Sequence, residues 1–335
     1  MNDRGHSHST SRLEPTRHAH GAADSSILGT ENGLWAIKGS FAGLVVTAVF
    51  QLVIVYLSGS VALLADTIHN FGDAATAIPL WIAFTLERRK PTKRFTYGLG
   101  RVEDLAGVAI VSIIFLSAVV AGYESVIGLL YPRKVEHLGA VIIASIVGFF
   151  GNEGVAIFRI KIGKQIGSAA LIADGYHARV DGLASLGVFA GALAVAAGYP
   201  SADPIVGLLI TIVILRIVCE SGKSVFTRLL DGVDPKVIDE IKHAAGRVSE
   251  VGNVSEVRVR WLGHRLHVEL NIAVNQSLSV EKGHEIAKTV RHELLHHLRY
   301  LSNATIHIDP ANASGEEHHS VVEHSHDDLP AHSHS

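Results

Sequence analysis

Apolar residues fill the first two thirds of the 335-residue chain in stretches of about 20, separated by short polar connections. A helix of roughly 20 apolar residues is long enough to cross the hydrocarbon core of a bilayer. The pattern therefore predicts an integral membrane protein with an all-α bundle of six transmembrane helices over residues 34–228. The predicted spans cover approximately residues 36–57, 61–86, 104–130, 138–160, 168–198 and 204–226.

Beyond residue 228 the pattern becomes that of a small soluble domain. Asp234 followed by Pro235 is typical of a helix start, because the aspartate can cap the helix and proline fits its first turn. Alternating apolar positions predict two strands joined by a tight turn at Gly263-His264, and then a helix and a third strand. The order α-β-β-α-β over residues 229–310 predicts a small α+β domain. The strands are expected at about residues 255–261, 266–274 and 304–308, and the second helix at about 280–298.

Both ends of the chain are polar and rich in histidine. Residues 1–33 and 311–335 hold too few apolar side chains to form a core, so both are predicted to be disordered tails. The N-terminal end lacks the apolar stretch of a signal peptide, and no cleaved signal is expected. The tail histidines have two open interpretations: they bind zinc and raise its local concentration, or they are simply polar ends.

Basic residues concentrate in alternate connections between the predicted spans. Lysine and arginine are more frequent on the cytoplasmic side of a membrane protein than on the opposite side. The connections after the second and fourth spans are basic, whereas those on the other side hold only Arg133 and Lys134, so both termini are predicted to be cytoplasmic. The basic residues in question are Arg88, Arg89, Lys90, Lys93, Arg94 and Arg101, and then Arg159, Lys161 and Lys164.

The remaining composition narrows the range of functions. The formal net charge of −3 gives no reason to expect a nucleic acid as partner. The single cysteine, Cys219, excludes an intramolecular disulfide and a cysteine-rich metal site.

The pattern His-x-x-x-Asp occurs in the second and in the fifth predicted span, as His69 with Asp73 and as His177 with Asp181. Residues four apart lie on one face of a helix. At about 1.5 Å per residue, both pairs fall roughly 12–20 Å deep, near the middle of a core about 30 Å thick. Two imidazoles and two carboxylates at one depth form a tetrahedral ligand set for a divalent ion such as Zn²⁺. Ionisable groups are costly within a membrane, so the sequence predicts a metal-ion transporter.

Other polar residues of the predicted spans have two interpretations each. Asp66 and Asp174 precede the two histidines by one turn, and either belong to an access path for the ion or bond a neighbouring helix. Asn152 and Glu153 of the fourth span either line a proton route or form a contact between helices. The His-x-x-x-Asp pairs could themselves be structural contacts, but two pairs of the same spacing and depth favour metal binding.

One motif in the C-terminal domain predicts a different class of protein. His292-Glu293-Leu-Leu-His296 matches HExxH, in which two histidines bind zinc and the glutamate acts as general base. A membrane-bound zinc metalloprotease is therefore an alternative. The helix register argues against it, because Val290 and Leu294 form the buried stripe and leave both histidines on the polar face. A membrane-anchored metal sensor is a third possibility, whereas a transporter, which is not an enzyme, best explains the paired ligands in the membrane.

Two stretches of the chain resemble the motifs of the cation diffusion facilitator family. They are Ser-Gly-Ser-Val-Ala-Leu-Leu-Ala-Asp-Thr-Ile-His69-Asn-Phe-Gly-Asp73 and Ala-Asp-Gly-Tyr-His177-Ala-Arg-Val-Asp181. The resemblance covers about residues 34–310. It implies a homodimeric, proton-coupled exporter of divalent metal, with a cytoplasmic domain similar to a ferredoxin-like metallochaperone. The transport site carries over to the two His-x-x-x-Asp pairs, and a set of two histidines and two aspartates is similar to that of the zinc-preferring members.

The resemblance has further implications for residues and partners. Arg101 and Asp231 match a charge pair found at the dimer interface of the family. A cytoplasmic metal site is matched only in part. Zn²⁺ is expected as a substrate rather than a cofactor, with Cd²⁺, Co²⁺ or Fe²⁺ as open possibilities, and a prokaryotic plasma membrane is favoured because no long histidine-rich loop joins spans four and five. The candidate ligands of the cytoplasmic site are His264, His284, His307 and Asp309.

Overall fold

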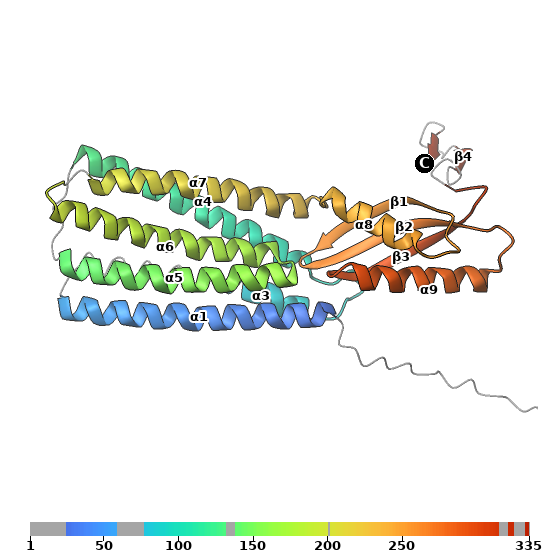
Figure 1. Ribbon diagram of the computed structural model, residues 1–335, viewed down its shortest axis with the longest axis horizontal. Helices are drawn as coiled ribbons and strands as arrows, with labels where there is room; N and C mark the ends of the chain where they lie inside the picture. The colour runs from blue at the N-terminus through green and yellow to red at the C-terminus, as the bar shows by residue number, and fades with distance from the viewer. Residues whose placement is uncertain are drawn as a thin grey trace, which may run out of the picture.

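The protein is an elongated molecule with a helix bundle at one end and an α+β domain at the other (Figure 1). A computed structural model describes residues 25–58, 77–131, 138–199, 202–314, 321–324 and 332–334. The bundle contains α1 (Ser25–Ser58), α3 (Ala77–Glu87), α4 (Arg101–Leu130), α5 (Leu138–Ile166), α6 (Ala169–Ala196) and α7 (Ala202–Leu229).

Five helices of the described chain, α1, α4, α5, α6 and α7, are long and apolar enough to cross a membrane. They match five of the six predicted spans. Of the other span, the second, only its last part is described, as α3. Large apolar side chains such as Phe50, Phe115 and Phe150 point outward from the bundle. A water-soluble domain would bury side chains of this size, whereas lipid accommodates them.

Helix α1 begins earlier than the sequence predicts. Residues 25–33 were expected to belong to a disordered tail, but they extend the first span by more than two turns. The physical reason is packing: Thr30 and Leu34 are buried, and a Cβ at Gly33 would lie 2.7 Å from the ring of Phe84 in α3. Thr30 and Gly33 of this polar stretch are thus packed inside the protein, whereas Glu31 and Asn32 are exposed.

Helices α5 and α6 approach each other closely because small residues lie between them. A Cβ at Gly175 of α6 would come within 2.7 Å of Ile160 and 3.1 Å of Arg159, and a Cβ at Gly163 of α5 would come within 2.8 Å of Ile172. Small residues at such positions let helix backbones in a membrane come together. This close contact fixes the polar groups of α6 against α5.

The C-terminal domain has the predicted order α-β-β-α-β. It consists of α8 (Pro235–Gly246), β1 (Asn253–Leu262), β2 (Arg265–Val274), α9 (Val280–His297) and β3 (Leu301–Pro310). Strand β2 is central, antiparallel to β1 and parallel to β3. The side chain of Asp234 caps α8 by accepting a hydrogen bond from the amide of Lys236, as the Asp-Pro pair predicts. A core that includes Ile241, Leu270 and Val290 joins both helices to the sheet.

Two short strands lie in the C-terminal tail, where the sequence predicts disorder. Strand β4 (Val321–His324) pairs with β5 (His332–His334) in antiparallel fashion. In an antiparallel pair, backbone groups of one strand bond to those of the other.

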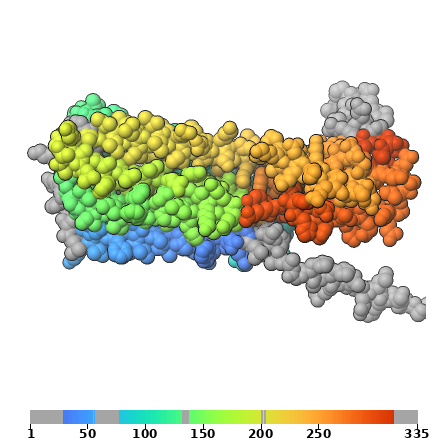
Figure 2. Space-filling model, viewed as in Figure 1, coloured from blue at the N-terminus to red at the C-terminus, as the bar shows by residue number. Residues whose placement is uncertain are grey.

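The bundle and the C-terminal domain form one continuous body on the face shown in Figure 2. The turn between β1 and β2 contacts the start of α4, where the amide of Gly263 donates a hydrogen bond to Asp104. The hydroxyl of Tyr300 donates to the carbonyl of Lys164 at the end of α5 over 2.8 Å. The guanidinium of Arg228 lies over the ring of Trp261, 4.1 Å from its centre. These contacts set the position of the domain on the bundle.

Candidate functional site

Helix α6 carries the second His-x-x-x-Asp pair on one face inside the bundle. His177 is 1% exposed, and its Nδ1 lies 3.9 Å from Oδ1 of Asp181. Two ligand atoms that are each about 2.0–2.2 Å from a zinc ion lie at most roughly 4.3 Å apart. The two side chains can therefore bind one ion from α6 alone.

The first pair, His69 and Asp73, lies outside the described residues, as does Asp66. The half of the four-ligand site on the second span therefore stays a prediction. The structure describes the half on α6, together with the polar groups that surround it.

Asn152 of α5 lies beside the α6 pair. It is buried, and a Cβ at Gly182, which follows Asp181, would lie 3.5 Å from the Cβ of Asn152. Ser185 lies one turn farther along α6 and donates a hydrogen bond to the carbonyl of Asp181. Polar side chains thus continue along the α5–α6 contact on both sides of the aspartate.

Asp174 forms a buried ion pair with Arg159 of α5. The two side chains are 0% and 1% exposed, and Nη1 of Arg159 lies 2.9 Å from Oδ2 of Asp174. Of the two interpretations of Asp174, the structure favours the contact with a neighbouring helix. The location of Arg159 corrects the sequence analysis, which assigned this residue to the connection between the fourth and fifth spans. Helix α5 continues to Ile166, so Arg159 lies about two turns before its end.

Glu153 also contacts α6. Both of its carboxylate oxygens accept hydrogen bonds from Arg179, over 2.7 and 3.1 Å. This two-point ion pair supports the interpretation of Glu153 as a contact between helices. The sequence placed Arg179 inside the repeated motif but gave no partner for it, because the partner lies on another helix.

Arg101 and Asp231 are in contact within one chain, and their location at a dimer interface, which the family resemblance implies, stays a prediction. The guanidinium of Arg101 donates a hydrogen bond to the Asp231 carboxylate and another, over 3.0 Å, to the carbonyl of Leu229. Asp231 has a positive φ of 61°, at the point where the chain leaves α7. The arginine therefore ties the start of α4 to the connection between the bundle and α8.

The candidate cytoplasmic metal ligands divide into two groups. His307 and Asp309 lie on β3 with Nε2 3.1 Å from Oδ1, and His284 is exposed on α9. His264 precedes β2, whose residue Leu266 pairs with Leu301, so it lies about 20 Å along the sheet from His307. The expectation that His264 shares a site with the other three is wrong for a single chain, because the parallel register places it at the opposite end of the domain.

His264 is instead buried against the bundle. Its Nδ1 lies 2.8 Å from Oε2 of Glu103, and its Nε2 lies 3.3 Å from Oγ1 of Thr30. Burial alone would lower the pKa of His264, but the charge and the hydrogen bond of Glu103 outweigh it, and the pKa is raised. The nearby His267 has a lowered pKa, because burial and then the positive charges of Arg260 and Arg265 disfavour its protonated form.

The HExxH motif lies on an exposed face of α9. His292 and His296 are both exposed, with their Nε2 atoms 3.0 Å apart, whereas Val290 and Leu294 are buried in the domain core. Glu293 faces His297 at 3.5 Å. This arrangement agrees with the register argument from the sequence, because a protease would need these groups in a cleft that holds a peptide.

Comparison with known proteins places both parts of the chain. Residues 37–230 match the family described as the cation efflux transmembrane domain, and residues 233–311 match the cytoplasmic domain of the cation efflux protein. A probable cation efflux system protein of Mycobacterium tuberculosis (strain H37Rv) is 50% identical over 316 residues, which are 91% of this chain and 95% of that protein.

A more distant relative has a metal in its name. The manganese efflux system protein of Bacillus subtilis is 25% identical over 259 residues, 75% of this chain and 87% of that protein. Among solved structures, the MamM CTD in a cadmium form has 28% identity and a TM-score of 0.22, and covers 22% of this chain and 94% of that one.

Proposed function

This chain belongs to the cation efflux, or cation diffusion facilitator, family, and from that premise we propose that it exports Zn²⁺ in exchange for protons. Membership makes it a membrane-spanning transporter of metal cations and not an enzyme. The metal, the proton coupling and the orientation are the parts that we propose here.

One observation carries the choice of zinc: the buried His177 lies within reach of Asp181 inside a helix of membrane-spanning length. Imidazole nitrogen suits Zn²⁺ better than the harder Mn²⁺, which prefers carboxylate and carbonyl oxygen. With His69 and Asp73 completing the set, two nitrogens and two oxygens give the tetrahedral coordination common for zinc. The manganese efflux relative shows that family membership alone does not fix the metal, so the ligands have to.

Proton exchange follows from the same ligands. A histidine binds metal only when its imidazole is neutral, and an aspartate only when it is ionised, so metal binding competes with protons. Protons that reach the site from the far side would displace Zn²⁺ and reset the empty site. Protonation also avoids leaving two carboxylates without compensating charge in the bundle interior.

The orientation that fits export has both termini and the C-terminal domain in the cytoplasm. The basic residues that the sequence analysis assigned to the cytoplasmic side, apart from Arg159, lie in the described connection between α3 and α4, at the first residue of α4 and near the end of α5. These segments lie at the end of the bundle that meets the domain (Figure 1). This agrees with the excess of positive charge on cytoplasmic sides. A homodimer in a bacterial plasma membrane, joined through the C-terminal domains, is the assembly that we propose.

We expect a pH gradient to drive zinc flux by the purified protein in sealed liposomes. With Zn²⁺ on the side of the C-terminal domain and acid on the other side, transport should be several times faster than with equal pH. The measurement is zinc accumulation reported by a fluorescent indicator, repeated with Cd²⁺, Co²⁺, Fe²⁺ and Mn²⁺. Flux that is indifferent to the gradient would remove the exchange mechanism, and faster Mn²⁺ than Zn²⁺ flux would remove the choice of metal.

The protease alternative makes a prediction of its own. Glu293→Ala removes the only general base that HExxH provides, yet we expect zinc flux within about twofold of the wild type, because Glu293 lies on α9 of the C-terminal domain, outside the bundle. The measurement is the same liposome assay, together with incubation of the wild type with casein. Peptide cleavage that depends on Glu293 would revive the alternative.

A further inference from the structure

A buried polar cluster lies where the C-terminal domain meets the bundle. Glu87 is the last residue of α3, Glu103 lies in the first turn of α4, and His264 lies in the turn between β1 and β2. Their side chains are 2%, 1% and 2% exposed. Three elements that are far apart in the sequence thus bring two carboxylates and an imidazole to one point.

The distances suit metal ligands. Nδ1 of His264 lies 2.8 Å from Oε2 of Glu103 and 3.4 Å from Oε2 of Glu87. One ligand atom from each of the three side chains lies within 4.8 Å of the others. Ligands at about 2.0–2.2 Å from a divalent ion have mutual distances of roughly 3–4 Å, so small side-chain rotations would close the site.

The surroundings prepare Nδ1 of His264 to bind. Nε2 of the same ring faces Oγ1 of Thr30 at 3.3 Å. Nδ1 is the atom that faces both carboxylates. A bound divalent ion would take the place of the proton that Nδ1 shares with Glu103, while the proton on Nε2 is donated to the Thr30 hydroxyl. Hydrogen bonds from the second nitrogen commonly fix the tautomer and the orientation of a metal-binding histidine.

The backbone of the turn is also fixed. The amide of His264 donates to Oε2 of Glu103 over 3.0 Å, and the amide of Gly263 donates to Asp104. Gly263 has a positive φ of 63°, and a Cβ there would lie 2.6 Å from the Glu103 carboxylate. Only glycine fits this close approach, which brings the imidazole to the carboxylates.

The charge of the cluster favours a cation. Neither carboxylate oxygen of Glu87 accepts a hydrogen bond from any described residue, although Nε of Arg265 lies 3.0 Å from Oε1 as an ion pair. Oε2 of Glu87 points instead to His264. Buried carboxylates are costly unless their charge is compensated, and a divalent ion would compensate Glu87 and Glu103 together.

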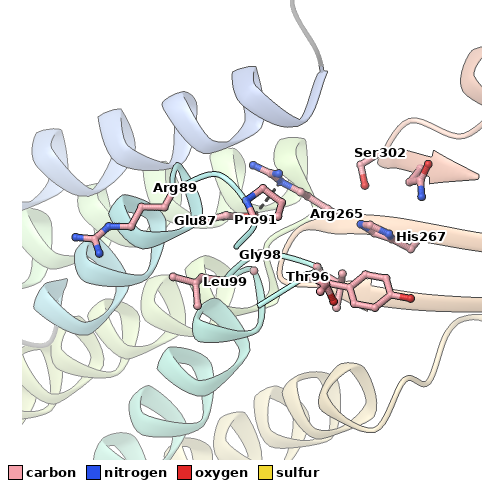
Figure 3. A pocket seen from close by; sticks show the side chains of 13 residues that line it. Glu87, Arg89, Pro91, Thr96, Gly98, Leu99, Arg265, His267 and Ser302 are labelled. Carbon is pink, nitrogen blue, oxygen red and sulfur yellow. Dashed lines mark ion pairs between the residues drawn. The ribbon is translucent and has the colours of Figure 1, made fainter. Parts of the chain in front are cut away.

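A cavity next to the cluster provides access for an ion. It has a volume of about 330 Å³, and Glu87, Arg265, His267 and Leu99 are among its lining residues. In Figure 3 the side chains of Glu87 and Arg265 lie between the helix bundle and the strands of the C-terminal domain. Water in this cavity could complete the coordination of an ion that three side chains hold.

We propose that Glu87, Glu103 and His264 bind a divalent transition-metal ion at the junction of the bundle and the C-terminal domain. This site is separate from the transport site on α6 and does not depend on the proposed transport of zinc. Because its ligands come from α3, α4 and the β1–β2 turn, the bound ion holds the C-terminal domain to the two helices. The ligand set of one nitrogen and two carboxylates accepts Zn²⁺, Co²⁺ or Mn²⁺.

The test counts bound zinc in the full-length protein in detergent. All proteins carry Asp181→Ala, so that the transport site contributes little and a failure of the proposed transport cannot affect the result. Adding Glu87→Gln should weaken the binding of one ion per chain by at least about 10-fold, measured by competition with a chelator. The matched control is His267→Gln, which changes a residue of the same cavity that is outside the cluster and should leave zinc binding unchanged.

A second measurement covers the case in which Glu87→Gln does not fold. Co²⁺ bound in the Asp181→Ala protein should give a visible absorption band, and adding Glu103→Gln should reduce this band. Zinc should also raise the unfolding temperature of the Asp181→Ala protein more than that of the variant that carries both Asp181→Ala and Glu103→Gln. Equal zinc numbers and affinities with and without the cluster substitutions would overturn the proposal. That result would leave the cluster as a set of ion pairs and hydrogen bonds only.

Discussion

Replacing Asp181 by alanine should reduce zinc flux at least about 100-fold. Loss of even an indirect partner of a metal ligand typically costs about 10–100-fold in affinity or activity, and Asp181 is a proposed direct ligand. Its carboxylate lies 3.9 Å from the His177 imidazole on the same face of α6, so its removal leaves the imidazole as the one proposed ligand on that helix. Flux into liposomes at several zinc concentrations would show the loss.

The control is Asp239→Ala, the same substitution at an exposed position of α8. It should transport zinc like the wild type. The Asp181→Ala protein should also elute as a single species and keep the unfolding temperature of its C-terminal domain. Near-normal zinc flux in the Asp181→Ala protein would show that the transport site lies elsewhere.

Replacing Arg159 by leucine should destabilise the bundle by about 3–5 kcal/mol. Removal of one partner of a buried ion pair leaves the other charge uncompensated in a medium of low dielectric constant. Asp174 is fully buried, and the Arg159 guanidinium lies 2.9 Å from its carboxylate. The expected result is a lower unfolding temperature of the purified protein in detergent.

The double replacement Arg159→Leu with Asp174→Leu should recover much of the loss, because apolar side chains can replace a buried ion pair at little cost. The matched control is Lys288→Leu, which breaks the exposed pair with Glu285 on α9 and should leave the unfolding temperature nearly unchanged, because solvent screens an exposed ion pair. Each replacement is also measured alone. If the losses of stability caused by Arg159→Leu and by Asp174→Leu add up in the double variant, the two charges do not stabilise each other and this explanation of the pair is wrong.

The fold could be predicted largely from the sequence because its signals are local. Apolar stretches of membrane-spanning length indicated the helices, and the change of period after residue 228 indicated the α-β-β-α-β domain, which the structure confirms. The i,i+4 spacing likewise placed His177 and Asp181 on one face of α6. The family and the transport of cations followed from the same motif.

Contacts between elements could not be predicted in the same way. Nothing near Arg159 in the sequence shows that Asp174 is its partner, since only the close packing of α5 and α6 brings them together. His264 was grouped with other histidines of its domain, whereas the register of β2 and β3 places it against Glu103 of the bundle. The early start of α1 depends in the same way on the burial of Thr30 and Gly33.

By itself, the sequence determined most of the helices, the three strands of the C-terminal domain, and which face of α6 carries an imidazole and a carboxylate. These properties depend on the spacing of residues along one element. The tertiary structure alone decided which buried charges compensate each other and how the C-terminal domain meets α3 and α4. Those properties depend on the distance between side chains on different elements, which packing sets and residue order does not record.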